Sequence, residues 1–218
     1  MEIKELSERY GINLRKLEEE QEKLFKSLEL KDKIDFSLAD RFGGVKNSMF
    51  GKQMISAIIV CDKNFEIIDQ VYFIDKVKFP YIPGFIAYRD LPVMMGAFNK
   101  LEEKPDVIFV LGNGITHQRL GIASHFSLST GVPSIGIVDS LVKGECKGED
   151  VIFEKNKIAR VLVTKSGSRP MYISPGNNIT LESAYQLSKN LINLPHKYPE
   201  PLTLANKYMK RIIKELNT

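Results

Sequence analysis

Apolar residues near the start of the chain follow a helical pattern. Between residues 12 and 30 they recur at steps of three and four among many Glu and Lys residues, which predicts an amphipathic helix. Its apolar positions are Leu14, Leu17, Leu24, Phe25 and Leu28. The charged run from Glu18 to Lys23 is most simply the solvated face of this helix.

Short apolar runs rich in Ile, Val and Phe follow, and residues that favour turns separate them. The runs span residues 42–48, 54–61 and 65–76. They predict three successive antiparallel strands. Residues 85–103 then predict a helix that contains Pro92 and ends before Pro105. A helix after three strands indicates an α/β protein.

In the second half, apolar runs at residues 106–111 and 134–138 flank a helical segment at 118–130. Short apolar strands joined through a helix imply a buried parallel pair with a right-handed crossover. Further strands are expected at 151–153, 158–164 and 171–174, and closing helices at 180–193 and 202–215. Because no repeat, low-complexity segment or linker interrupts the pattern, we expect one domain over residues 1–218.

Composition narrows the class of protein only a little. The chain has 218 residues and is 43% hydrophobic, enough for one substantial core. Its 31 basic and 27 acidic residues leave a formal charge of +4. This charge is compatible with nucleic acid but too small to argue for a polyanion partner by itself.

The cysteines and the apolar stretches bear on location. Cys61 and Cys146 are too few for a disulfide framework and their spacing suits no zinc motif, so buried or bystander thiols are expected. No apolar stretch approaches the roughly 18 residues that cross a bilayer, and residues 1–10 carry charges where a signal peptide is apolar. We expect a cytoplasmic protein without a membrane partner, and the oligomeric state stays open.

The first candidate loop runs from Leu111 to His117. Open α/β sheets bind ligands beyond the carboxyl ends of their parallel strands, where this loop is expected. Gly112 and Gly114 let backbone approach a ligand closely, and the histidine is able to carry a proton or bind phosphate. The alternative is a glycine-rich turn with a hydrogen-bonded loop histidine.

The second candidate loop opens at Asp139, directly after the run 134–138. A carboxylate at the end of a strand either holds a metal or caps the turn that follows, here at Ser140 and Leu141. Both interpretations of Asp139 stay open on local grounds.

The third candidate segment spans residues 79–85, where two prolines and a glycine stiffen a stretch that contains Tyr81, Ile82 and Phe85. Such a projection could wedge into stacked bases, and an exposed tyrosine could stack on one; the alternative is a proline-fixed entry into the core. Cationic side chains could line a groove for a nucleic-acid backbone, although each is also explained as solubilising. They are Lys46, Arg89, Arg119, Lys143, Lys147, Arg169 and Lys197.

Five segments, in order and with similar spacing, resemble the signature of the endonuclease V family. They are 81–90 (YIPGFIAYRD), 112–117 (GNGITH), 119–125 (RLGIASH), 132–136 (VPSIG) and 173–176 (ISPG). The resemblance extends from about Ile12 to the C-terminus. It implies an α/β fold similar to ribonuclease H, a mixed central sheet flanked by helices. It also implies cleavage of DNA or RNA near deaminated bases such as inosine, with magnesium held by carboxylates.

The resemblance also implies roles for individual residues in binding nucleic acid. The strand-separating wedge would be formed by Tyr81, Ile82, Pro83 and Gly84. Residues expected near a captured base are Gly112, Asn113, Gly114, Ser174, Pro175 and Gly176. Arg89 and Arg119 would contribute to the same nucleic-acid-binding surface.

The positions that carry catalysis in the family are where this chain departs from it. Lys46 stands at the first-strand aspartate, Asp90 at the wedge-helix glutamate and Leu111 at the aspartate before the glycine loop; His117 is retained, and Asp139 replaces a lysine. Metal-dependent hydrolysis needs a cage of hard oxygen ligands. We therefore expect a nucleic-acid-binding protein whose magnesium-dependent cleavage is lost or strongly weakened.

Two further expectations concern these replacements. The exchanges at Lys46 and Asp139 are reciprocal, which predicts an ion pair between them, because one buried charge without a partner is costly. The alternative function is an active nuclease that rebuilds a Mg²⁺ or Mn²⁺ site from Asp90, Asp139 and a further carboxylate such as Asp62, with His117 as a proton or phosphate partner. A structural or protein-partner role on an inherited scaffold is a third interpretation.

Overall fold

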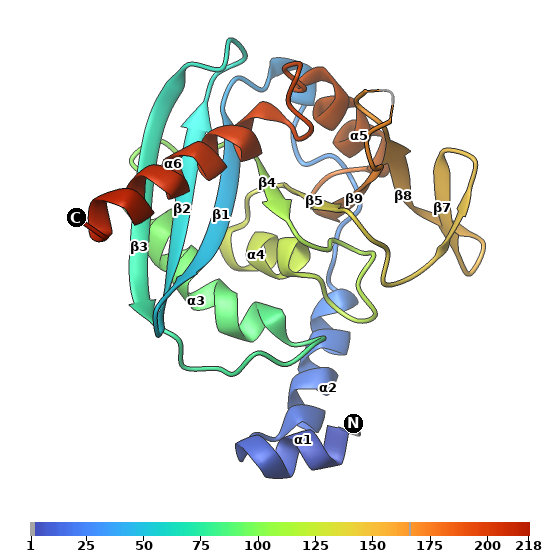
Figure 1. Ribbon diagram of the computed structural model, residues 1–218. Coiled ribbons are helices and arrows are strands. Elements are labelled where there is room, and N and C mark those ends of the chain that lie inside the picture. The colour runs from blue at the N-terminus through green and yellow to red at the C-terminus, as the bar shows by residue number, and fades with distance from the viewer. Residues whose placement is uncertain (1–2, 166) are drawn as a thin grey trace.

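The computed structural model describes residues 3–165 and 167–218, and in these residues a nine-stranded mixed sheet carries helices on both faces (Figure 1). The strand order is β3-β2-β1-β4-β5-β9-β8-β7-β6. The strands are β1 (Phe42–Phe50), β2 (Gln53–Cys61), β3 (Ile67–Lys76), β4 (Val107–Leu111), β5 (Ser134–Val138), β6 (Glu145–Lys147), β7 (Asp150–Phe153), β8 (Asn156–Leu162) and β9 (Met171–Asn177). The helices are α1 (Ile3–Tyr10), α2 (Leu14–Phe25), α3 (Ile86–Lys100), α4 (Ile122–Thr130), α5 (Leu181–Asn190) and α6 (Glu200–Leu216), with a 3-10 turn at Phe36–Leu38.

The strand pairing agrees with the expected topology. β1, β2 and β3 pair antiparallel, whereas β4 is parallel to both β1 and β5. Helix α4 forms the crossover between β4 and β5, as the apolar pattern predicts. β9 returns antiparallel to β5 and continues the sheet toward β6. The α/β fold expected from the sequence is therefore confirmed.

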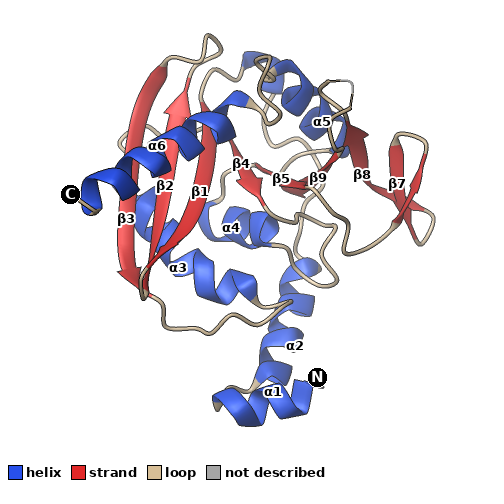
Figure 2. Ribbon diagram, viewed as in Figure 1, coloured by secondary structure: helices blue, strands red, loops and turns tan. Residues whose placement is uncertain are grey.

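Two helical layers enclose the sheet (Figure 2). Helices α3 and α4 pack on one face, against residues such as Val45 and Val110. Helices α5 and α6 pack on the other face, against residues such as Phe109. At Gly44 a side chain would overlap the backbone of Pro201, so only glycine lets the first turn of α6 lie this close to β1.

Some elements differ from the expected ones. The first predicted helix is shorter, as α2, and a separate helix, α1, precedes it. The three exposed residues of β6 were also not predicted. The three residues of β6 are too few and too exposed to give a hydrophobic pattern, whereas α1 is as amphipathic as α2 and was missed.

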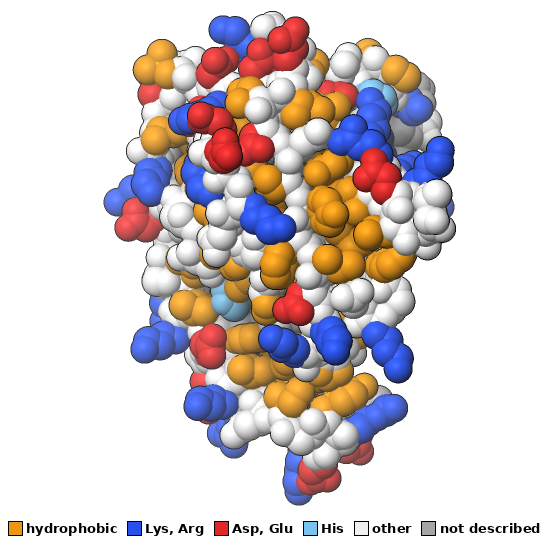
Figure 3. Space-filling view, turned by 90° about the vertical axis from the view of Figure 1, so that its left-hand side faces the viewer, with side chains coloured by type: hydrophobic (Ala, Val, Ile, Leu, Met, Phe, Trp, Pro, Cys, Tyr) orange, Lys and Arg blue, Asp and Glu red, His pale blue; other side chains and the backbone are white. Residues whose placement is uncertain are grey.

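Surface charge is mixed. On the side of the molecule that carries β3, basic and acidic side chains lie interspersed around exposed apolar ones (Figure 3). No single-sign field covers this face, in keeping with the small formal charge of +4.

Candidate functional site

A cavity of about 220 Å³ lies where β4 ends and the glycine loop begins. The last parallel pair between β1 and β4 joins Val45 to Val110. Beyond this pair β1 has no neighbour on its β4 side, because β4 ends at Leu111, whereas its pairing with β2 continues. The cavity is lined by Lys46 and Asn47 from β1, Asp90 from α3, and Leu111, Asn113 and His117 from the loop, among others. Three of the positions that the resemblance assigns to catalysis, 46, 90 and 111, thus border one cavity together with His117.

Asp90 is buried, with 7% of its surface exposed, and both carboxylate oxygens already have partners. Arg89 Nε donates to Oδ1 at 2.7 Å, and Asn47 Nδ2 donates to Oδ2 at 3.3 Å. The amide oxygen of Asn47 is buried without a hydrogen-bond partner in the part of the chain that the structure describes. A cation that bound Asp90 would therefore have to compete with the guanidinium of Arg89.

Lys46 also borders this cavity, but its side chain leaves β1 on the opposite face. Side chains alternate along a strand, so Lys46 shares the face of Gly44, which α6 covers, while Val45 and Asn47 face α3. The Lys46 side chain forms no hydrogen bond, ion pair or ring contact with any residue described by the structure. Its positive charge is therefore uncompensated.

The side chains around this cavity do not fit a magnesium site of the kind the family resemblance implies. Mg²⁺ prefers several oxygen ligands in octahedral geometry. Leu111 has no ligand atom, Lys46 is a cation, and the one carboxylate, Asp90, is paired with Arg89. Over residues 3–165 and 167–218, no three His, Cys, Asp or Glu side chains gather closely enough to hold a metal ion.

His117 is a neutral hydrogen-bonding group. Its burial, and secondarily the positive charges of Arg119 and Lys143, lower its pKa to about 4. The ring Nδ1 accepts a hydrogen bond from the Arg119 backbone N–H at 3.1 Å, so the proton of the neutral ring is on Nε2. His117 is thus hydrogen-bonded within its loop and is one of the residues that line the cavity.

Strand β9 packs against the glycine loop on the side away from the cavity. Ser174 Oγ accepts from the Gly114 backbone N–H at 3.2 Å, and a side chain at Gly114 would overlap the Pro175 carbonyl. Ser174, Pro175 and Gly176 are all buried. Of the residues expected near a base, Gly112 and Asn113 line the cavity, whereas Gly114 and the β9 residues support the loop.

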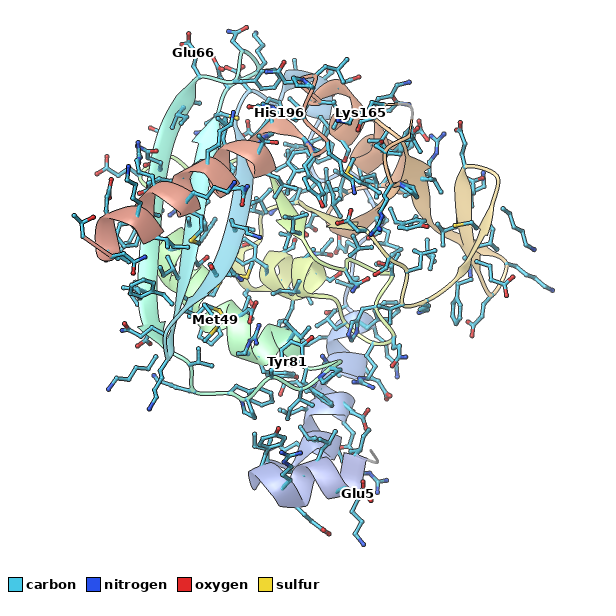
Figure 4. All side chains as sticks on the ribbon, viewed as in Figure 1. Glu5, Met49, Glu66, Tyr81, Lys165 and His196 are labelled. Carbon is cyan, nitrogen blue, oxygen red and sulfur yellow. The ribbon has the colours of Figure 1, made fainter. Side chains whose placement is uncertain are left out.

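The expected wedge divides into exposed and buried parts. Tyr81 is 59% exposed on the loop that leads into α3, at the end of the molecule near α1 and far from His196 (Figure 4). Its ring lies 4.9 Å from the Arg89 guanidinium. Pro83 is also exposed, whereas Ile82 is fully buried and anchors the segment in a small core cluster. Only part of the predicted projection is therefore accessible.

Arg119 is an internal link rather than a free cation. Its guanidinium pairs with Glu18 at 2.6 Å, donates to Gln21 Oε1 at 2.8 Å and reaches the Gly84 carbonyl at 3.5 Å. Gln21 also donates to the Gly84 carbonyl at 3.1 Å and is fully buried. Interpreting residues 18–23 simply as a solvated face was therefore wrong, because two of these residues join α2 to the wedge segment and the glycine loop.

A second cavity of about 550 Å³ adjoins the first on the side of α1. The two share Gly84, Ile86, Asn113 and His117 as lining residues. Residues of α1, including Leu6, complete its wall. The amino-terminal helix α1, which was not predicted from the sequence, thus contributes to the candidate interface.

Asp139 lies outside the cavity that contains Asp90. It accepts hydrogen bonds from Lys197 Nζ at 2.7 Å and from the Tyr198 hydroxyl at 2.6 Å. Burial raises its pKa, but these hydrogen bonds outweigh that effect and the pKa is lowered overall. The expected ion pair with Lys46 is wrong, because β4 separates the two strands and the segment before α6 supplies a nearer cation.

Asp62 does not join the cavity either. Its carboxylate accepts from the backbone N–H groups of Asn64 and Glu66 in the turn after β2. This turn follows Cys61, which pairs with Phe42 at the start of β1. Asp62 therefore lies at the opposite end of β1 from the cavity.

The remaining candidate cations and the two cysteines do not line the cavity that contains Asp90. Lys143 lies 4.3 Å from the ring of Phe153, Lys147 and Arg169 are exposed, and Lys197 is paired with Asp139. Both cysteines are free thiols, as expected; burial raises the pKa of Cys61 to about 12, and Cys146 is exposed. Among the described residues, the helices are all too short or too polar to cross a membrane.

The mixed sheet, the parallel β1-β4-β5 core and the two flanking helical layers define the ribonuclease H-like class. Residues 22–207 match the family model described as Endonuclease V. The chain belongs to the endonuclease V family, as the five motifs predict.

Individual relatives agree with this assignment. An endonuclease V of Thermosipho melanesiensis is 37% identical over 183 residues, covering 80% of each chain. The crystal structure of a Bacillus subtilis endonuclease V superimposes with a TM-score of 0.80 at 30% identity, covering 91% of this chain and 92% of that one. A Ciona intestinalis endonuclease V in complex with DNA has the same fold, with a TM-score of 0.84 at 21% identity over 93% of this chain and 98% of that one.

Proposed function

We propose that this chain is a nucleic-acid-binding member of the endonuclease V family in which magnesium-dependent phosphodiester cleavage is lost or strongly weakened. The observation that carries the proposal is the chemistry of one cavity. Lys46, Asp90 and Leu111 converge there, and the single carboxylate is already held by Arg89 and Asn47. Without a cage of oxygen ligands, a divalent ion has no place from which to orient water and stabilise the leaving oxygen.

Features suited to recognition persist beside this cavity. Tyr81 is exposed and its ring is supported by Arg89, which suits stacking on a base. The glycine loop places Gly112 and Asn113 at the cavity wall, and β9 holds the loop in shape. Arg119 supports the same architecture from within, so the proposal assigns it a positioning role.

The nucleic acid to test first is one that contains inosine. The Ciona intestinalis structure holds a 24mer DNA with an inosine followed by a ribo-adenosine. We extend this ligand class to the present chain as part of the proposal, with DNA and RNA both as candidates. If the chain does cleave, Mg²⁺ or Mn²⁺ is the cofactor to expect.

The test combines binding and cleavage on the same labelled strands. Single- and double-stranded DNA and RNA, with and without inosine, are titrated with protein in EDTA and then incubated with Mg²⁺ or Mn²⁺. We expect salt-dependent binding and no cutting above background. Tyr81→Ala should weaken binding by about 5- to 150-fold, the equivalent of about 1–3 kcal/mol for one lost stacking contact.

A matched control distinguishes recognition from a general loss of fold. Tyr208 on α6 also carries an arginine over its ring, with Arg211 at 4.9 Å, but it packs toward Tyr72 on β3, away from the cavity. Tyr208→Ala should leave affinity unchanged in protein that remains folded. Metal-dependent cutting abolished by Asp90→Ala and Asp139→Ala would overturn the proposal in favour of a rebuilt active site. Absence of any salt-dependent affinity would favour a protein-partner role.

A further inference from the structure

Three side chains connect the exposed Tyr81 ring to the wall of the cavity at the end of β4. The Arg89 guanidinium carbon lies over the Tyr81 ring, 4.9 Å from its centroid. Arg89 Nε donates to Asp90 Oδ1 at 2.7 Å, and Asn47 Nδ2 on β1 donates to Asp90 Oδ2 at 3.3 Å. The contacts therefore run from the sheet through Asp90 and Arg89 to a tyrosine that is 59% exposed.

Arg89 is the main support of the Tyr81 side chain. Among the residues that the structure describes, Arg89 alone makes a cation–π or aromatic contact with the ring, and the Tyr81 hydroxyl has no hydrogen-bond partner. The neighbouring Ile82 is fully buried, which fixes the backbone of the segment but not the tyrosine side chain. The position of the ring therefore depends on where the guanidinium lies.

Asp90 fixes the guanidinium in turn. The Arg89 and Asp90 side chains are only 17% and 11% exposed, so the charge-assisted hydrogen bond between them is largely shielded from water. A guanidinium is planar and rigid, so a bond to its Nε restricts the position of the whole group. In the described part of the chain, Asp90 is the only carboxylate that pairs with Arg89. Without Asp90 the long arginine side chain would regain rotamers that take it away from the ring.

We infer that Asp90 is a positioning residue, which holds the Arg89 guanidinium over the Tyr81 ring and so keeps the ring in place for a base to stack on. The inference rests on the proposed function and deepens it. Asp90 stands where the family resemblance implies a metal ligand, but both of its oxygens are engaged by Arg89 and Asn47. A ring that is ordered before binding loses less conformational entropy when a base stacks on it.

Loss of Asp90 should change affinity in the direction opposite to simple electrostatics. Nucleic acid is polyanionic, so removing an acid near its binding surface would by charge alone tighten binding. Loss of the Asp90 carboxylate should instead weaken binding, because Arg89 no longer supports Tyr81. The loss of a metal ligand would differ again, because it would matter only when the ion is present.

The experiment measures affinity by fluorescence anisotropy for a labelled, inosine-containing single strand, in EDTA and in Mg²⁺. The wild type is compared with Asp90→Leu, Arg89→Lys, Tyr81→Ala and the double variant that combines Tyr81→Ala with Asp90→Leu. Asp106→Leu is the matched control, because it also removes a partly buried acid that pairs with an arginine, Arg41, at 3.1 Å. Asp106 directly precedes β4, at the opposite end of that strand from the cavity. Thermal melting of each variant establishes that it is folded.

We expect Asp90→Leu to weaken binding by about 2- to 12-fold, equally in EDTA and in Mg²⁺, which is the cost of ordering one side chain on binding. Arg89→Lys should weaken binding to a similar extent, because an ammonium lacks the planar group that bonds Asp90 and covers the ring together. In the Tyr81→Ala background, Asp90→Leu should have no further effect, which a general disturbance of the fold would not produce. Asp106→Leu should bind as the wild type does.

Unchanged or tighter binding by Asp90→Leu overturns the inference. A loss seen only in Mg²⁺ also overturns it and identifies a metal ligand, and so do additive effects of Asp90→Leu and Tyr81→Ala. If Asp90→Leu does not fold, Arg89→Lys tests the same contact, and wild-type affinity of that variant is the contrary result. Failure of the wild type to bind any strand would refute the proposed function itself, whereas binding that depends on Tyr81 but not on Asp90 refutes only this inference.

Discussion

Arg119→Met is expected to destabilise the fold strongly, although arginine on a protein surface is usually replaceable. The guanidinium pairs with Glu18 at 2.6 Å and Gln21 at 2.8 Å, and its side chain is only 16% exposed. Removal leaves the Glu18 carboxylate, itself 21% exposed, without its ion-pair partner, and leaves the side-chain oxygen of the fully buried Gln21 without its donor, while Gln21 keeps its hydrogen bond to the Gly84 carbonyl. Breaking a buried pair costs about 3–5 kcal/mol; because the Arg119 and Glu18 side chains are 16% and 21% exposed, we expect about 2–3 kcal/mol here.

The measurement is urea unfolding of the wild type and variant, followed by circular dichroism. For a chain of this size, a loss of that magnitude lowers the melting temperature by roughly 4–12 °C. Arg15→Met is the matched control because Arg15 pairs with Glu19 on the same helix at 3.6 Å, with both side chains largely exposed at 85% and 69%. It should cost no more than about 0.5 kcal/mol. Equal losses in the two variants would refute the assignment of Arg119 as an internal link.

Three other predictions follow from the same structure. The pKa of His117 in the folded chain is about 4, below its ordinary value of 6.5. Between these pH values the unfolded chain binds more protons, so the free energy of unfolding should fall as the pH falls from 6.5 to 4. His117→Gln should flatten this part of the stability profile, and an unchanged profile would contradict the burial of His117. Gly114→Ala should destabilise the fold by about 1–3 kcal/mol, because the new methyl group overlaps the Pro175 carbonyl and Ser174 Oγ. If the variant unfolds in urea at the same concentration as the wild type, the glycine loop does not pack tightly on β9. The expected single domain predicts one cooperative unfolding transition seen alike by circular dichroism and tyrosine fluorescence, and two separated transitions would show that the chain divides.

The order of strands and helices was accessible from the sequence because it depends on local pattern. Runs such as the one in β2 are apolar on both faces, and the parallel pair of β4 and β5 follows from two short apolar runs joined by a helix. Helix α1 was missed although it is as amphipathic as α2, and none of its residues is buried. Hydrophobic patterning therefore identified the elements that form the core more readily than those outside it.

The family motifs predicted that positions 46, 90 and 111 converge on one cavity. They did not predict the side-chain partners of the residues in and around it. Gln21 looks like one polar residue in a charged run, and only the folded chain brings it to Gly84 and Arg119. The reciprocal exchange at Lys46 and Asp139 suggested a pair, but the tertiary fold offers Asp139 a nearer cation in Lys197. Side-chain partners far apart in sequence depend on tertiary geometry that periodicity does not encode.

The measurement that tests the central claim most directly is a titration of the wild-type protein with Mn²⁺, followed by the loss of the free ion's electron paramagnetic resonance signal. With Lys46 and Leu111 at the cavity and Asp90 held by Arg89, we expect no stoichiometric binding site. One Mn²⁺ bound per chain at micromolar affinity, and lost in Asp90→Asn, would contradict the claim.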